Sequence, residues 1–134
     1  MRDTFSKTFP ILGEDDIRRS ATAIGDTNPI HHDEAAAITN GFLGIVLPGV
    51  SILGLVSSTI AEESPGAALH GFQVKFKGPL YAGSRPCVEC RITASKAQVI
   101  ALAVAVKNGF EIIATGTCTV LMPENKASQE EMAA

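Results

Sequence analysis

Aromatic residues and basic charge are both scarce in this 134-residue chain. It has no tryptophan and one tyrosine, although hydrophobic residues make up 46% of the sequence. A core must therefore be built mainly from aliphatic side chains. The 11 lysines and arginines are outnumbered by 14 acidic residues, which gives a formal net charge of −3. Because proteins that bind nucleic acid neutralise phosphates with clustered basic side chains, we expect no nucleic acid among the partners.

Cysteines and targeting signals are also sparse. The three cysteines are an odd number without the spacing of a disulfide framework, which favours a reducing compartment. Cys87 and Cys90 have the spacing of some metal sites, but residues three apart on a strand point to opposite faces, so we expect no metal and no cofactor. The first residues lack a basic segment followed by an apolar run, so we expect no secretory signal. The sequence predicts a cytoplasmic protein.

One long uncharged stretch lies over residues 35–61. Its mostly apolar part, residues 42–60, approaches the roughly 20 residues that a helix needs to cross a bilayer. The stretch also contains glycines and serines, and the segments that follow it have the pattern of soluble strands. A helix that is apolar on all sides is equally expected when it is buried inside a domain. We therefore predict a buried central helix over 48–63 and no membrane among the partners.

The hydrophobic period changes along the chain. Before residue 64 the apolar spacing favours helices, whereas after residue 71 apolar and polar residues alternate as in half-buried strands. Asn108-Gly109 is a strong signal for a two-residue hairpin turn. The predicted helices are 13–24, 34–39 and 48–63, and the predicted strands are 4–9, 72–77, 88–94, 99–106 and 110–122. We predict an α+β fold with a single domain over 1–123, in which an antiparallel meander covers the long helix, and a polar tail over 124–134.

The densest cluster of polar groups is the segment 25–33, Gly-Asp-Thr-Asn-Pro-Ile-His-His-Asp, between two predicted helices. Pro29 fixes its own φ and restricts Asn28, so the loop is stiff enough to hold Asp26 and His31 on either side of a small molecule. A carboxylate and an imidazole are a suitable pair for the proton transfers of an addition or elimination. The same residues also fit a plain turn, capped by Asp26 and carrying solvated histidines.

The hexapeptide Asp26-Thr27-Asn28-Pro29-Ile30-His31, read as D-x-N-P-x-H, resembles the signature of the MaoC-like dehydratases, which include the R-specific enoyl-CoA hydratases. Three further segments resemble that family in the same order. They are 42–49, which approaches the long helix, 74–83, which ends in a Pro and a Gly, and 115–120, which is similar to the family's last strand. Two departures are Pro48-Gly49, where the family often has His-Gly, and Gly83-Ser84, where it often has Gly-Asp.

The resemblance implies a hot dog fold, in which a curved antiparallel sheet wraps a long central helix. It also implies a homodimer or dimer of dimers with the acyl-thioester tunnel near the subunit interface. The implied reaction is reversible syn hydration of trans-2-enoyl-CoA to (R)-3-hydroxyacyl-CoA, with coenzyme A or an acyl carrier protein as the thioester carrier. By position, Asp26 and His31 bind the catalytic water, the Gly49 amide polarises the thioester oxygen, and Asn28 contributes to substrate binding. The neighbouring His32 is expected to point elsewhere and to tolerate substitution.

Two other functions are compatible with the same fold, because a fold alone does not fix a function. A thioesterase would direct water at the thioester carbonyl, and a binding module would hold the acyl thioester without chemistry. The loop with Asp26 and His31 argues against both. Hot dog thioesterases generally lack D-x-N-P-x-H, and binding alone needs neither proton carrier.

Overall fold

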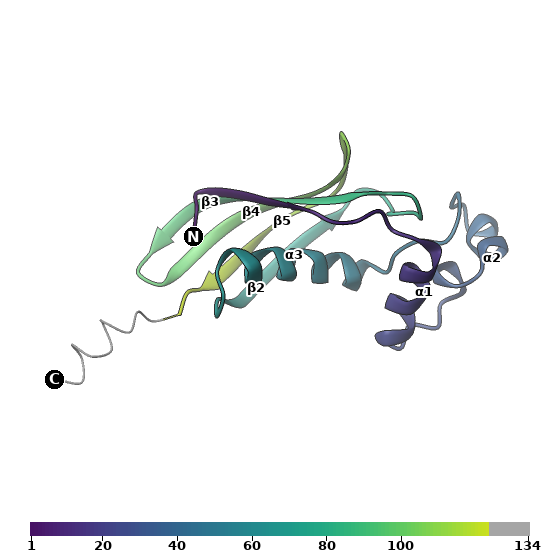
Figure 1. The fold of residues 1–134 in the computed structure, drawn as a ribbon, viewed down its shortest axis with the longest axis horizontal. Helices are drawn as coiled ribbons and strands as arrows, with labels where there is room; N and C mark the ends of the chain where they lie inside the picture. Colours follow the sequence, from purple (N-terminus) through teal and green to yellow (C-terminus); the bar gives the residue numbers. More distant parts are fainter. Residues whose placement is uncertain (124–134) are drawn as a thin grey trace.

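The structure, a computed structural model, describes residues 1–123; the predicted tail over 124–134 lies outside the described residues. Five antiparallel strands form one sheet, and a long helix, α3, lies along one face of it (Figure 1). The shorter helices gather at one end. The elements in chain order are β1 (Thr4–Thr8), α1 (Glu14–Ala23), the 3-10 helix η1 (Pro29–His31), α2 (Glu34–Thr39), α3 (Gly49–Glu63), β2 (Ala68–Phe76), β3 (Pro86–Lys96), β4 (Val99–Asn108) and β5 (Glu111–Leu121). This arrangement confirms the predicted α+β class.

The strand order differs from the simple meander predicted from the sequence. Strands β3, β4 and β5 do follow one another, but β2 pairs with β5, which gives the order β1-β3-β4-β5-β2. Consecutive strands are neighbours in most sheets but not in all. The connection 77–85 between β2 and β3 therefore has to pass the end of the sheet. There Tyr81 forms an isolated antiparallel bridge with Val46, in the segment that leads into α3.

Close contact between β2 and β5 depends on a glycine. A Cβ atom on Gly116 of β5 would lie 2.2 Å from the main-chain oxygen of Gln73 on β2. No side chain fits at that distance, so the pairing of these two strands requires glycine at this position. The hairpin turn predicted at Asn108-Gly109 is present, with Gly109 at φ +61° between β4 and β5.

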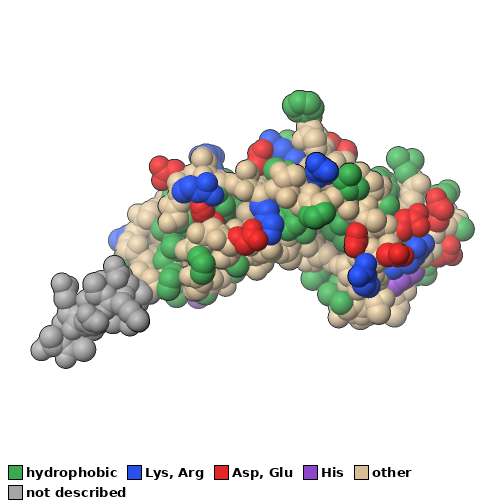
Figure 2. Space-filling view, viewed as in Figure 1, with side chains coloured by type: hydrophobic (Ala, Val, Ile, Leu, Met, Phe, Trp, Pro, Cys, Tyr) green, Lys and Arg blue, Asp and Glu red, His purple; other side chains and the backbone are tan. Residues whose placement is uncertain are grey.

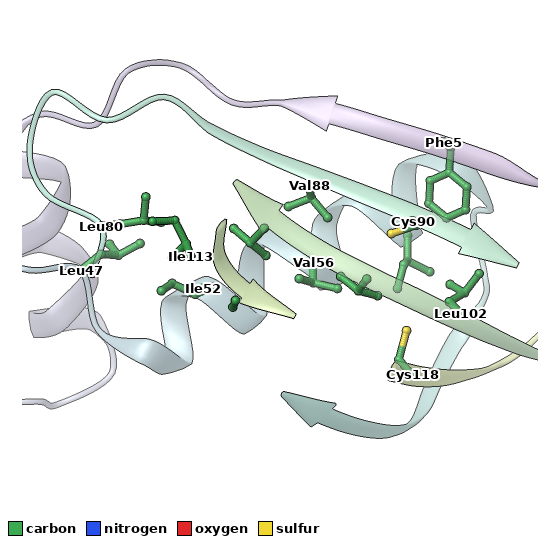
Figure 3. Close-up of a cluster of buried hydrophobic side chains, with 14 of the residues drawn as sticks. Phe5, Leu47, Ile52, Val56, Leu80, Val88, Cys90, Leu102, Ile113 and Cys118 are labelled. Atoms are coloured by element: carbon green, nitrogen blue, oxygen red, sulfur yellow. The ribbon is translucent and has the colours of Figure 1, made fainter. Parts of the chain in front are cut away.

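Helix α3 presents one apolar stripe to the sheet. Ile52, Val56 and Ile60 are each at most 3% exposed, and their four-residue spacing places them on one face of the helix. Figure 3 shows Ile52 and Val56 among strand side chains that include Val88 and Leu102. The predicted aliphatic core is therefore observed between α3 and the sheet. No helix in the described part of the chain has both the length and the apolar character to cross a membrane.

Acidic and basic side chains lie close together at the end of the molecule where α1 and α2 lie (Figure 2). The first turn of α1 carries Glu14, Asp15 and Asp16, which suits the positive end of a helix dipole. Arg18, one turn further on, pairs with Glu14 at 3.3 Å between Nη1 and Oε2. The loop with the D-x-N-P-x-H sequence follows directly after this helix.

Candidate active site

The loop between α1 and α2 is held by its own hydrogen bonds. The Asp26 amide donates to the Ala21 carbonyl of α1 at 2.9 Å. The Asp26 Oδ1 atom then accepts from the Asn28 amide at 3.0 Å, and the Asn28 Oδ1 atom accepts from the Ile30 amide at 3.2 Å. Pro29 is at the first position of η1, and its fixed φ suits a helix start. The loop therefore takes a compact form. The sequence predicted a stiff loop but not this 3-10 turn.

That form brings together the two residues predicted to be proton carriers. The Nε2 atom of His31 lies 3.2 Å from the Oδ2 atom of Asp26, and the His31 side chain is only 8% exposed while that of Asp26 is 35% exposed. On its other side, the His31 Nδ1 atom lies 2.7 Å from the main-chain oxygen of Val46. The imidazole is thus buried between a carboxylate and a carbonyl, and the carboxylate reaches the surface.

The contact with Val46 fixes which nitrogen carries hydrogen. A carbonyl oxygen can only accept, so the His31 Nδ1 atom must be the donor. In the neutral ring the Nε2 atom then has a lone pair that faces the carboxylate of Asp26, which is also an acceptor. Two facing acceptors need a proton between them. Either the pair holds one proton, or it binds a water molecule that donates to both groups, and either arrangement is suited to moving protons.

The carbonyl that orients His31 is itself held in place. The Val46 amide donates to the Ile30 carbonyl at 3.1 Å, and the next amide, that of Leu47, donates to the Leu80 carbonyl at 2.9 Å. The Tyr81 hydroxyl accepts from the Leu43 amide at 3.2 Å. The segment before α3 is therefore fixed both to the D-x-N-P-x-H loop and to the connection after β2.

The same segment ends at the N-terminus of α3. Gly49 is the first helical residue and follows Pro48, and the amides of Ser51 and Ile52 both turn back to the Pro48 carbonyl at 3.0 and 3.3 Å. Within residues 1–123, the Gly49 amide donates no hydrogen bond. An unpaired amide at the positive end of a helix is a donor suited to a partly negative oxygen. Gly49 is thus three residues from the Val46 carbonyl that orients His31.

Sequence reasoning missed three contributions to this site. The Val46 contact comes from a main-chain oxygen, which no residue type signals. The ring of Phe76 lies against Gly49, with its Cζ atom 3.1 Å from the place of a Cβ. The ring of His32 contacts the start of the loop, since its Nε2 atom lies 2.8 Å from the main-chain oxygen of Asp26. Among the described residues, no cluster of three or more potential ligands could hold a metal ion.

Comparison with known proteins identifies the family of the chain. A family model described as MaoC like domain matches residues 2–113. The 3-hydroxyacyl-[acyl-carrier-protein] dehydratase FERN, mitochondrial, of Solanum lycopersicum is 28% identical over 123 residues, which cover 88% of this chain and 73% of the relative. The (R)-specific enoyl-CoA hydratase of Aeromonas caviae is 30% identical over 91 residues, which cover 66% of each chain. The unliganded R-hydratase PhaJ1 from Pseudomonas aeruginosa superposes with a TM-score of 0.82 at 26% identity, over 91% of this chain and 81% of that one.

The helix wrapped by an antiparallel sheet is the hot dog fold of these hydratases, as the resemblance implied. The chain belongs to the MaoC-like domain family, whose model spans most of the described residues. The predicted class of enzyme, a hydro-lyase, is confirmed by relatives that are named as hydratases and dehydratases.

Proposed function

We propose that this protein catalyses the reversible hydration of a trans-2-enoyl thioester to the (R)-3-hydroxyacyl thioester, with Asp26 and His31 activating the water. The observation that supports this most directly is the pairing of the two side chains, 3.2 Å apart, with the outer nitrogen of His31 anchored on a carbonyl. Addition and elimination of water need a group that takes a proton and a group that returns one. This pair can do both.

In the hydration direction, a water molecule donates to the Asp26 carboxylate and to the His31 Nε2 atom. Its oxygen forms a bond to C3 of the enoyl group as Asp26 accepts a proton. The electron pair of the C2–C3 double bond moves toward the thioester oxygen. A proton from the Asp26–His31 pair is then delivered to C2, and one water has been added in all. Because both transfers come from one place, they reach the same face of the double bond, which gives syn addition.

The charge that develops on the thioester oxygen needs a donor aimed at it. The Gly49 amide, at the start of α3 and with the helix dipole behind it, is our candidate for this donor. Asn28 is the second candidate for substrate contact. Its side-chain oxygen already accepts from Ile30, so a contact with the thioester would use the side-chain NH₂ group.

The experiment that tests the function uses the purified chain with crotonyl-CoA, and in parallel with the same acyl group on an acyl carrier protein. Loss of enoyl absorbance and release of free thiol are followed together, and the product is analysed for its configuration at C3. We expect absorbance to fall without thiol release and the product to be R. Thiol release would show a thioesterase, and neither change with either carrier would contradict the proposal. Comparison of the activities on the two substrates shows whether the enzyme uses thioesters of coenzyme A or of an acyl carrier protein.

Two further proposals concern the setting of the enzyme. We propose that residues 1–123 act as one catalytic domain, which the family match over 2–113 supports.

We also propose that the protein works in the cytoplasm, which the presence of three free cysteines supports. Fractionation of cells that express a tagged chain tests the second proposal, and recovery in a membrane or organelle fraction would contradict it.

A further inference from the structure

The residue after His31 is a second histidine that the proposed chemistry does not use. Its Nε2 atom lies 2.8 Å from the main-chain oxygen of Asp26, and the ring is partly buried. Since a carbonyl can only accept, the His32 Nε2 atom must carry the hydrogen. The ring therefore spans the loop from its end back to its start. The two adjacent neutral rings therefore carry hydrogen on different nitrogens, Nδ1 in His31 and Nε2 in His32.

His32 is itself fixed from two sides. The Arg18 Nε atom on α1 donates to the main-chain oxygen of His32 at 3.0 Å. The His32 amide donates to the Pro29 carbonyl at 3.0 Å, inside the 3-10 turn. An anchored main chain limits where the ring can go, so the hydrogen bond to Asp26 is made by a side chain with little freedom.

The peptide groups on both sides of the Asp26 Cα atom are consequently tied down. The amide of Asp26 donates to the Ala21 carbonyl of α1 at 2.9 Å, and its carbonyl accepts from His32 at 2.8 Å. The carboxylate, by contrast, is partly exposed; its Oδ1 atom accepts from the Asn28 amide and its Oδ2 atom faces His31. With these few contacts, its position also depends on the main chain that carries it. A displacement of a catalytic group by about 1 Å can lower a rate by roughly 100-fold.

We propose that His32 is a positioning residue that holds the main chain of Asp26, and thereby sets the carboxylate against His31. The kinetic consequence rests on the proposed hydratase function. This proposal replaces the expectation that substitution of His32 is tolerated, because that expectation did not include the contact with the Asp26 carbonyl.

The kinetic test compares His32→Ala with His32→Gln, since the glutamine side-chain NH₂ can reach the same carbonyl. The matched control is His70→Ala, which removes an exposed histidine from β2. We expect His32→Ala to lower kcat on crotonyl-CoA by about 10-fold with little change in KM, as a misplaced base affects the reacting geometry more than binding. His32→Gln should recover most of that loss, and His70→Ala should match wild type. Wild-type kcat in His32→Ala, or equal losses in the alanine and glutamine variants with folding intact, would overturn the proposal.

A second measurement does not depend on activity. Long-range ¹H–¹⁵N correlation spectra of the histidine rings report which nitrogen carries hydrogen, and near pH 8 an ordinary histidine is neutral. We expect His32 to show hydrogen on Nε2 and His31 to show it on Nδ1, and the His31 signals to shift in His32→Ala but not in His70→Ala. Hydrogen on Nδ1 of His32 would overturn the inference. A chain with the expected spectra but no hydratase activity would instead contradict the proposed function and leave the role of His32 in the loop intact.

Discussion

The ring of Phe76 lies against the first residue of α3, where the Phe76 Cζ atom is 3.1 Å from the place that a Cβ on Gly49 would occupy. Phe76 is the last residue of β2 and is 50% exposed. A side chain at position 49 would therefore point at this ring.

A side chain at position 49 should obstruct the thioester. We expect Gly49→Val to fold, because valine is no worse than glycine in a helix and the half-exposed ring of Phe76 can move aside. Its kcat/KM on crotonyl-CoA should fall by about 100-fold, the scale of losing one oxyanion donor. Steady-state kinetics measure the effect, and circular dichroism shows whether the fold is kept.

Gly49→Val also displaces the ring of Phe76. A double variant separates the effect of this displacement on activity from obstruction of the thioester. Phe76→Ala alone provides the reference, and Gly49→Val is then added to it. If crowding against Phe76 were the whole effect, the double variant would have the activity of Phe76→Ala. Activity that stays far below that reference supports the Gly49 amide as the donor. A folded Gly49→Val single variant with nearly full activity would rule out this placement of the thioester.

The second prediction concerns the proton carriers. Asp26→Asn keeps an oxygen that can accept from the Asn28 amide, so the loop should survive while the base is lost. His31→Ala removes the other member of the pair. We expect each variant to lower kcat by about 100-fold or more, as is typical for general acid–base groups. The matched control is Asp33→Asn. Asp33 caps α2 by accepting from Ala35 at 3.1 Å, and asparagine caps equally well, so activity should be unchanged.

The residues of the D-x-N-P-x-H loop predicted that Asp26 and His31 lie on either side of a small molecule but also fitted a plain turn, and the resemblance favoured the first interpretation. The stiff loop was inferred from Pro29 and its effect on Asn28, and the structure places Asp26 and His31 in contact. A local segment of six residues has few conformations when it contains a proline. The position of Gly49 at the start of the long helix followed from equally local signals. Roles in catalysis for these residues remain predictions that the variants above test.

The rest of the site depends on contacts between distant segments. The Val46 carbonyl is 15 residues from His31, and main-chain oxygens are the same in every residue, so no sequence pattern could select it. Phe76 reaches Gly49 only because β2 lies at the edge beside β5, and the sequence predicted a simple meander instead. Alternation of apolar residues identifies strands but carries no information on which strands pair. The glycine at 116 that lets β2 approach is recognisable only once the pairing is known.

The third prediction is that the protein is a homodimer or a dimer of dimers. The sheet ends in β2, whose outer edge pairs with no other described strand, and an unpaired edge invites association. Several large apolar side chains are exposed, among them Leu43 at 83%, Val50 at 62% and Phe110 at 106%, and Figure 2 shows hydrophobic side chains on the visible face. Light scattering at micromolar concentration should give at least twice the 14.0 kDa mass of one chain. A stable monomer would contradict this prediction.

The fourth prediction concerns the cysteines. Burial raises the pKa of Cys90 to about 12, with a smaller contribution from Cys118, and burial raises the pKa of Cys118 to about 11. Both groups are therefore neutral thiols near neutral pH, and the thiolate is the reactive form. Cys87 is less buried. A chromogenic disulfide reagent should titrate no more than one thiol per native chain and all three in denaturant. Rapid reaction of two or three native thiols would show that the strand core opens.

The same two thiols predict that the fold becomes less stable at alkaline pH. In the unfolded chain a cysteine loses its proton near its ordinary pKa of 9.0, whereas native Cys90 and Cys118 keep theirs until about pH 12 and 11. Between these values the unfolded state binds fewer protons than the native state, so the free energy of unfolding decreases as pH rises. Tm should therefore fall between about pH 8 and about pH 10.5. The control that isolates the two thiols is a Cys90→Ala/Cys118→Ala double variant. Its Tm should start lower because two buried side chains are truncated, but it should fall less over the same pH interval. An equal fall in the two proteins would show that these thiols stay neutral in the unfolded chain as well, or ionise in the native one.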